Sequence, residues 1–168
     1  MMVVMTTITV RAISQDVISE LLESDDAGNP ARPFTATEDG SPLRCCLRPI
    51  RVGERVALVS YAPLRRWAAQ TGAEPGPYDE VGPVFIHADG CGGPAGSGYP
   101  APLASGHRVL RAYSAAGTIL GGTLLRPDAD PAAAEAVLAG MFADPEVALV
   151  HARALEFGCF TFEVRRAS

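Results

Sequence analysis

Lysine is absent from the 168-residue chain, whose 14 basic residues are all arginine. This absence excludes Schiff-base catalysis, a lysine general base and the lysine of a phosphate-binding P-loop. The 19 acidic residues give a net charge of -5, and the arginines form no basic block, which argues against a protein that binds duplex nucleic acid. Every fixed positive charge is therefore a guanidinium.

Long apolar runs are also missing. No segment approaches the roughly 18 consecutive apolar residues of a membrane-spanning helix, and the first ten residues lack the basic region of a secretion signal. Four cysteines, two of them adjacent, do not resemble a secreted disulfide framework. We expect a cytoplasmic protein that associates with neither membrane nor nucleic acid.

The length and composition fit one domain over residues 1–168. Periodicity and capping residues predict helices at 14–23, 64–71 and 131–142. Strands are expected at 6–13, 54–61, 84–88, 108–113, 118–125, 147–152 and 159–164. Strands that adjoin strands, with few helices, favour an α+β fold: a mostly antiparallel mixed sheet with two or three helices. The segment 89–106, rich in glycine and proline, is expected to be a long loop, either a surface insertion or a lid.

Several charged residues interrupt apolar strand patterns. His151 and Arg153 are two positions apart and should share one sheet face, while His87 lies at the end of its strand and Arg111 in the middle of another. A solvated sheet face would explain each of them. If instead these faces converge, the arginines could hold a carboxylate or phosphate while the histidines transfer protons.

The cysteines allow a second interpretation. His87 and Cys91 have a spacing that can chelate a metal, and Cys46 or Cys159 would complete a zinc-type ligand set. Because neighbouring strand residues point to opposite faces, Cys45 and Cys46 are not expected to serve one site together. No C-x-x-C pair is present, and a reactive thiol or ordinary buried cysteines remain alternatives.

Three motifs carry a resemblance to a known family: residues 42–47 (PLRCCL), 78–88 (YDEVGPVFIHA) and 144–153 (DPEVALVHAR). Together with 111–113 and 158–160 they resemble bacterial proteins grouped as domain of unknown function family 1203, over roughly residues 40–166. The resemblance implies a compact bacterial domain and supplies no mechanism. It also implies a C-x-x-C-like pair in the first motif, where this chain has Leu43 in place of the first cysteine. A second cysteine two or three residues after Cys159 is likewise implied, where this chain has Phe162.

The first functional hypothesis is a cofactor-independent acid–base enzyme, a lyase, isomerase, cyclase or hydrolase acting on a small anionic or polar metabolite. Its expected catalytic residues are His87, His151, Tyr61 and Glu80, and its expected substrate-binding residues are Arg44, Arg111, Arg153 and Tyr113. The alternative is a zinc- or thiol-dependent module that uses His87, Cys91 and either Cys46 or Cys159. A non-catalytic domain that binds a small ligand or a protein is the third hypothesis, and a homodimer is left open.

Overall fold

The computed structural model describes residues 6–168, within which ten strands form two five-stranded sheets. The first sheet is antiparallel throughout, in the order β1-β10-β9-β7-β8. Its strands are β1 (Ile8–Arg11), β7 (Arg108–Tyr113), β8 (Ile119–Leu125), β9 (Leu149–Ala154) and β10 (Phe160–Arg166). The hairpin expected at 108–125 is therefore present as β7 and β8.

The second sheet is mixed, in the order β2-β5-β6-β3-β4. Its one parallel pair joins β3 to β6, and its other pairs are antiparallel. Its strands are β2 (Phe34–Thr35), β3 (Pro42–Leu43), β4 (Arg48–Pro49), β5 (Arg55–Tyr61) and β6 (Gly82–His87). The predicted α+β class is confirmed, with the strands divided between two sheets.

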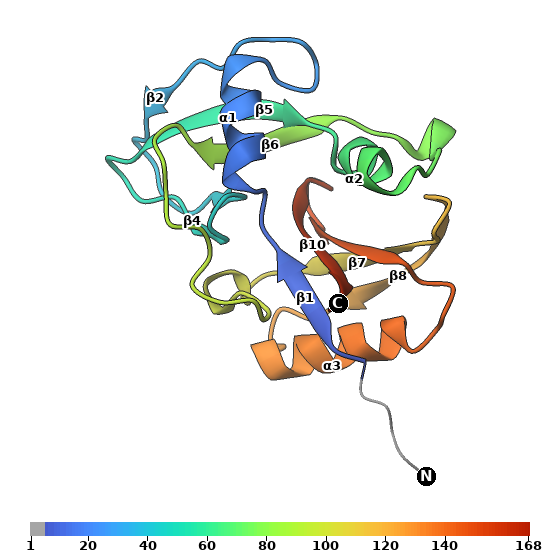
Figure 1. The fold of residues 1–168 in the computed structure, drawn as a ribbon. Helices are drawn as coiled ribbons and strands as arrows, with labels where there is room; N and C mark the ends of the chain where they lie inside the picture. The colour runs from blue at the N-terminus through green and yellow to red at the C-terminus, as the bar shows by residue number, and fades with distance from the viewer. Residues whose placement is uncertain (1–5) are drawn as a thin grey trace.

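Three helices cover these sheets, as the capping residues predicted. The Ser14 side chain accepts a hydrogen bond from the Val17 amide at the start of α1 (Gln15–Glu23). Helix α2 (Pro63–Thr71) ends at Gly72, whose φ of 79° suits glycine, and Asp130 caps α3 (Pro131–Phe142). Figure 1 shows α1 against β5 and β6 in the upper part of the molecule, and α3 beneath the antiparallel sheet.

Each sheet has its own hydrophobic core. Leu110, Leu138 and Phe162 belong to the core between the antiparallel sheet and α3. Leu21 and Ile86 belong to the core between α1 and the mixed sheet, which Phe160 of β10 also joins. The two sheets therefore meet along β10 and β6, where side chains from both can face common cavities.

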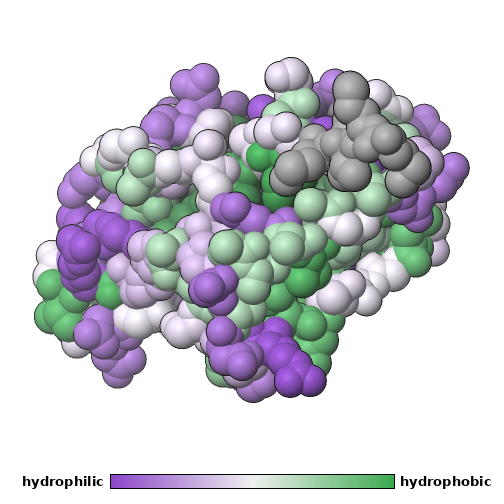
Figure 2. All heavy atoms as spheres, turned by 90° about the horizontal axis from the view of Figure 1, so that it is seen from below, coloured by the Kyte–Doolittle hydropathy of each residue, from purple (hydrophilic) through white to green (hydrophobic). Residues whose placement is uncertain are grey.

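The segment 89–106 is largely irregular, as expected, apart from the short 3-10 helix η2 (Ala101–Leu103). Among the hydrogen bonds that anchor it, the Val10 amide donates to the Ser97 carbonyl, and the Tyr99 amide donates to Glu135. Seen from below, the side on which α3 lies, the surface alternates hydrophilic and hydrophobic patches (Figure 2). Across residues 6–168, no helix combines the length and hydropathy that crossing a bilayer requires.

Candidate metal centre

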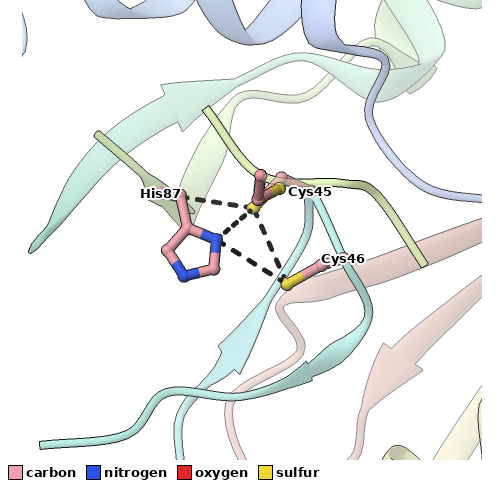
Figure 3. A group of neighbouring side chains, drawn as sticks. Cys45, Cys46 and His87 are labelled. Carbon is pink, nitrogen blue, oxygen red and sulfur yellow. Dashed lines mark hydrogen bonds between the residues drawn. The ribbon is translucent and has the colours of Figure 1, made fainter. Parts of the chain in front are cut away.

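Three thiols and one imidazole converge at the edge of the mixed sheet. The potential ligand atoms of Cys45, Cys46, His87 and Cys91 all lie within 4.8 Å of one another. His87 Nδ1 is 3.3 Å from Cys45 Sγ and 3.8 Å from Cys46 Sγ, and the two sulfurs are 4.0 Å apart (Figure 3). Zinc bonds of about 2.3 Å to sulfur and 2.0 Å to nitrogen give tetrahedral edges of roughly 3.5–3.8 Å. The spacings among Cys45, Cys46 and His87 are therefore close to the edges of a tetrahedral metal site.

The expectation that Cys45 and Cys46 face opposite sides is wrong. Alternation applies to extended strands, whereas residues 44–47 form the turn that joins β3 to β4. The Leu47 amide closes this turn on the Leu43 carbonyl at 3.0 Å, and Leu47 takes the left-handed φ of 55°. The turn therefore presents both sulfurs to the same side.

A carboxylate next to His87 determines which ring nitrogen carries the proton. His87 Nε2 lies 3.3 Å from Glu54 Oε1, and Arg48 holds that carboxylate at 2.5 Å. Hydrogen bonding by Arg48 is the largest cause that lowers the pKa of Glu54, to about 2. An ionised Glu54 favours the proton on Nε2, which leaves the Nδ1 lone pair facing the thiols, as in carboxylate–histidine–metal sites.

The two neighbouring thiols differ in acidity. The hydrogen bond from Cys45 lowers the pKa of Cys46, and the positive charge of Arg48 lowers it further. The same hydrogen bond, together with burial, raises the pKa of Cys45. Cys46 therefore loses its proton at a lower pH than Cys45. This favours metal binding, because cysteine binds metals as the thiolate.

Cys91 completes the set from the long loop. Its sulfur accepts a hydrogen bond from Gln15 Nε2 of α1 at 3.5 Å. A metal held by all four residues would link the β3–β4 turn, the end of β6 and the beginning of the loop. Three sulfurs and one nitrogen leave no open coordination position, which is typical of structural zinc sites.

Cys159 lies apart from this cluster. It sits in the turn between β9 and β10, where its thiol contacts the Phe157 carbonyl at 3.8 Å. Of the metal ligands proposed from the sequence, His87, Cys91 and Cys46 come together, and Cys45 takes the place considered for Cys159.

Four of the residues expected in an acid–base site line a cavity of about 360 Å³: Tyr61, Glu80, Arg111 and Arg153. Glu80 bridges the two arginines, with one oxygen 3.0 Å from Arg111 and the other 3.0 Å from Arg153. Arg153 also donates to the Gly158 carbonyl, and its Nη1 is buried without a partner. The expected pair of adjacent guanidiniums is therefore present, with a carboxylate of the chain between them.

His151 lies in the core of the antiparallel sheet, in a different sheet from His87. It is fully buried between the rings of Tyr113 and Phe160, each with its centroid 5.0 Å away. Its Nε2 is 3.2 Å from Glu163, while Nδ1 is buried with no partner. Burial lowers the pKa of His151 and favours the neutral ring. The eight expected catalytic and binding residues thus do not form one site, and Arg44 lines yet another cavity.

The model of the family described as Protein of unknown function (DUF1203) matches residues 40–166. The chain therefore belongs to this family, as the three motifs suggested. No curated protein and no solved structure matches the chain. The matched region contains all four residues of the cluster.

The sequence pattern did not indicate Cys45 as a ligand, nor the supporting pair Glu54 and Arg48. Pro49, two residues after Leu47, was a signal that the segment turns within the apolar run. Nothing in the sequence pattern marks Glu54, because its contact with His87 depends on how β5 pairs with β6.

Proposed function

We propose that the chain is a zinc-binding module in which Cys45, Cys46, His87 and Cys91 hold the metal. The observation that supports this most strongly is the mutual approach of the four ligand atoms to within 4.8 Å. A site of three thiolates and one imidazole suits zinc in tetrahedral coordination. When bound, zinc would supply a cross-link between three segments that are distant in the sequence.

The chain's own residues prepare this site. Glu54 orients His87 and keeps the proton on Nε2, and Arg48 keeps Glu54 ionised. The His87 amide donates to Cys45 Sγ at 3.3 Å, which stabilises negative charge on that sulfur. Because the four protein ligands complete the coordination, we assign the metal a structural role in holding the start of the loop 89–106 against the mixed sheet.

The experiment is metal analysis of natively purified protein, with thiols counted on the same sample. We expect about one zinc per chain and one fast-reacting thiol, Cys159. Chelation should then expose the other thiols. A matched pair of variants locates the site: Cys46→Ser should lose the zinc and Cys159→Ser should retain it. Zinc-free protein with four reactive thiols, or equal zinc in the two variants, would reject the proposal.

A second candidate function is supported by the Glu80 cavity. An acid–base enzyme for a small anionic or polar metabolite could use Glu80 as the proton acceptor. The substrate anion would replace Glu80 as the partner of Arg111 and Arg153. Tyr61, whose pKa burial raises, would remain protonated and could donate. Thermal-shift screening of anionic metabolites tests this, with Glu80→Gln as the variant. A compound that is turned over by wild type and not by the variant supports catalysis, whereas binding without turnover supports a ligand-binding domain.

A further inference from the structure

A cavity of about 520 Å³ opens where the two sheets meet, next to the Glu80 cavity, with which it shares Pro83, Phe157 and Cys159. It receives side chains from both sheets: Phe85 from β6, Arg108 from β7 and Thr161 from β10. Arg44 reaches it from the β3–β4 turn. Two of the side chains that line it, Arg108 and Thr161, carry a buried polar atom without a hydrogen-bond partner, and a third, Arg44, lacks a counter-ion.

Arg44 is a buried cation without a carboxylate. Only 4% of the residue is exposed, and its Nε and Nη1 donate to the carbonyls of Phe160 at 2.8 Å and Pro42 at 2.5 Å. Within residues 6–168, no acidic group lies at ion-pair distance from it. Burying a charge without a counter-ion is unfavourable, and an anion in the cavity would offset that cost.

Arg108 repeats this arrangement from the other sheet. Its terminal nitrogens donate to the carbonyls of His107 and Leu103 at 3.3 and 3.4 Å, while its Nε is buried without a partner. In the described part of the chain it too forms no ion pair with an acidic side chain. Two guanidiniums from different sheets thus face one cavity, and neither is neutralised.

Thr161 adds a hydroxyl that is buried with no hydrogen-bond partner. The pairing of β10 with β9 slips by one residue here, from Phe160 opposite Arg153 to Phe162 opposite Ala152, so Thr161 is the inserted residue. Such bulges redirect a side chain out of the regular alternation. In this chain the redirected side chain lines the cavity.

We propose that this cavity binds the carboxylate or phosphate group of a small metabolite between Arg44 and Arg108, with the Thr161 hydroxyl as a third donor. The half-buried ring of Phe85 and the exposed side chains of Leu58 and Phe157 would contact an apolar body on the ligand. Two exposed carboxylates, Asp39 and Glu156, also line the cavity. They would weaken binding of a compact, multiply charged anion and favour a singly charged group on an apolar body.

The test is calorimetric and thermal-shift titration of zinc-replete protein with benzoate, acetate and inorganic phosphate, against sodium chloride at equal ionic strength. We expect saturable binding, with benzoate tighter than acetate. Saturation by phosphate and not by benzoate would assign a phosphate-bearing ligand, and the reverse a carboxylate. Stabilisation that sodium chloride reproduces, or no saturation with any probe at millimolar concentration, would overturn the proposal.

Four variants make the test specific. Arg108→Gln should weaken binding by about tenfold or more, and Thr161→Val by a few-fold, because charged hydrogen bonds are worth more than neutral ones. Glu156→Gln should tighten it, since a repelling charge is lost. Arg126→Gln, at an exposed position outside the cavity, should change nothing. Arg108→Gln spares the β3–β4 turn, so its zinc content should equal that of wild type. Equal affinity in wild type and Arg108→Gln would contradict the assignment.

Discussion

Each of the two sheets contains a relay of three side chains, in which an arginine contacts a glutamate and the glutamate contacts a histidine. The two relays differ in what surrounds the histidine. In the mixed sheet Arg48 holds Glu54, which lies 3.3 Å from His87 Nε2. In the antiparallel sheet Arg165 holds Glu163 at 2.6 Å, and Glu163 lies 3.2 Å from the Nε2 of the other buried histidine, His151. In both relays the carboxylate fixes the ring and leaves Nδ1 to face the interior.

The atoms in contact with the histidine Nδ1 determine whether each ring can bind a metal. His87 Nδ1 meets two sulfurs at 3.3 and 3.8 Å, so the ring can serve as a metal ligand. His151 Nδ1 has no hydrogen-bond partner, and the ring packs against Tyr113 and Phe160. His87 and His151 both interrupt apolar strands, so the sequence pattern does not distinguish the candidate metal ligand from the histidine packed in the core. Four predictions separate the two relays.

The largest effect should come from removing the metal. With zinc free at about a thousandfold above its dissociation constant, binding contributes about 4 kcal/mol to the free energy of unfolding. In a chain of this size we therefore expect Cys46→Ser, or chelation of wild type, to lower the melting temperature by roughly 10 °C. Calorimetry with and without chelator measures this, and a chelator-insensitive wild type would contradict it.

The carboxylates should differ in their effect on the metal. Replacing a carboxylate behind a metal-bound histidine weakens metal affinity by about 10–100-fold. We expect that loss for Glu54→Gln and an unchanged zinc affinity for Glu163→Gln, measured by competition with a coloured chelator. An equal loss in both variants would show that the relays are not distinct in function.

The His151 relay should appear in the pH dependence of stability. Burial lowers the pKa of His151 below its ordinary value of 6.5, although Glu163 acts in the opposite direction. The unfolded chain therefore binds more protons as the pH falls below about 6.5, and the free energy of unfolding decreases. Arg153 and Glu80 also act on this ring, the first lowering and the second raising its pKa.

The measurement is denaturant unfolding between pH 5 and pH 8 on zinc-replete protein. His151→Gln keeps a donor for Glu163 and removes the titration, so its stability should fall less than that of wild type below pH 6.5. Parallel curves for the two proteins would rule out a neutral, buried His151.

The smallest effect should come from Cys159, the cysteine outside both relays. Cys159→Ser at this partly exposed turn should change the free energy of unfolding by no more than about 0.5 kcal/mol. It should leave the zinc content unchanged and abolish the fast thiol reaction of the metal-bound protein. A surviving fast thiol would mean that a cysteine of the cluster is not coordinated.

The local elements could be predicted from the sequence because their signals are local. Ser14, Gly72 and Asp130 mark helix ends by their own chemistry, and each lies at the end that it predicted. The hairpin of β7 and β8 followed in the same way from the turn residues between them. The division into two sheets depends on pairings between distant segments, such as β1 with β10, and no local pattern encodes these.

The candidate site was predictable only in part for the same reason. His87, Cys91 and Cys46 followed from residue type and spacing. Cys45 was excluded because the alternation of an extended strand was applied to what is a turn. Arg108 and Thr161 gave no signal, since one depends on how the sheets meet and the other on a bulge.

X-ray absorption at the zinc edge of natively purified protein would identify the atoms that bind the metal. We expect three sulfur ligands at about 2.3 Å and one nitrogen at about 2.0 Å. Wild type and Cys159→Ser should give the same spectrum. A coordination shell of oxygen and nitrogen alone, or protein that takes up no zinc, would contradict the assignment of Cys45, Cys46, His87 and Cys91 as a metal centre.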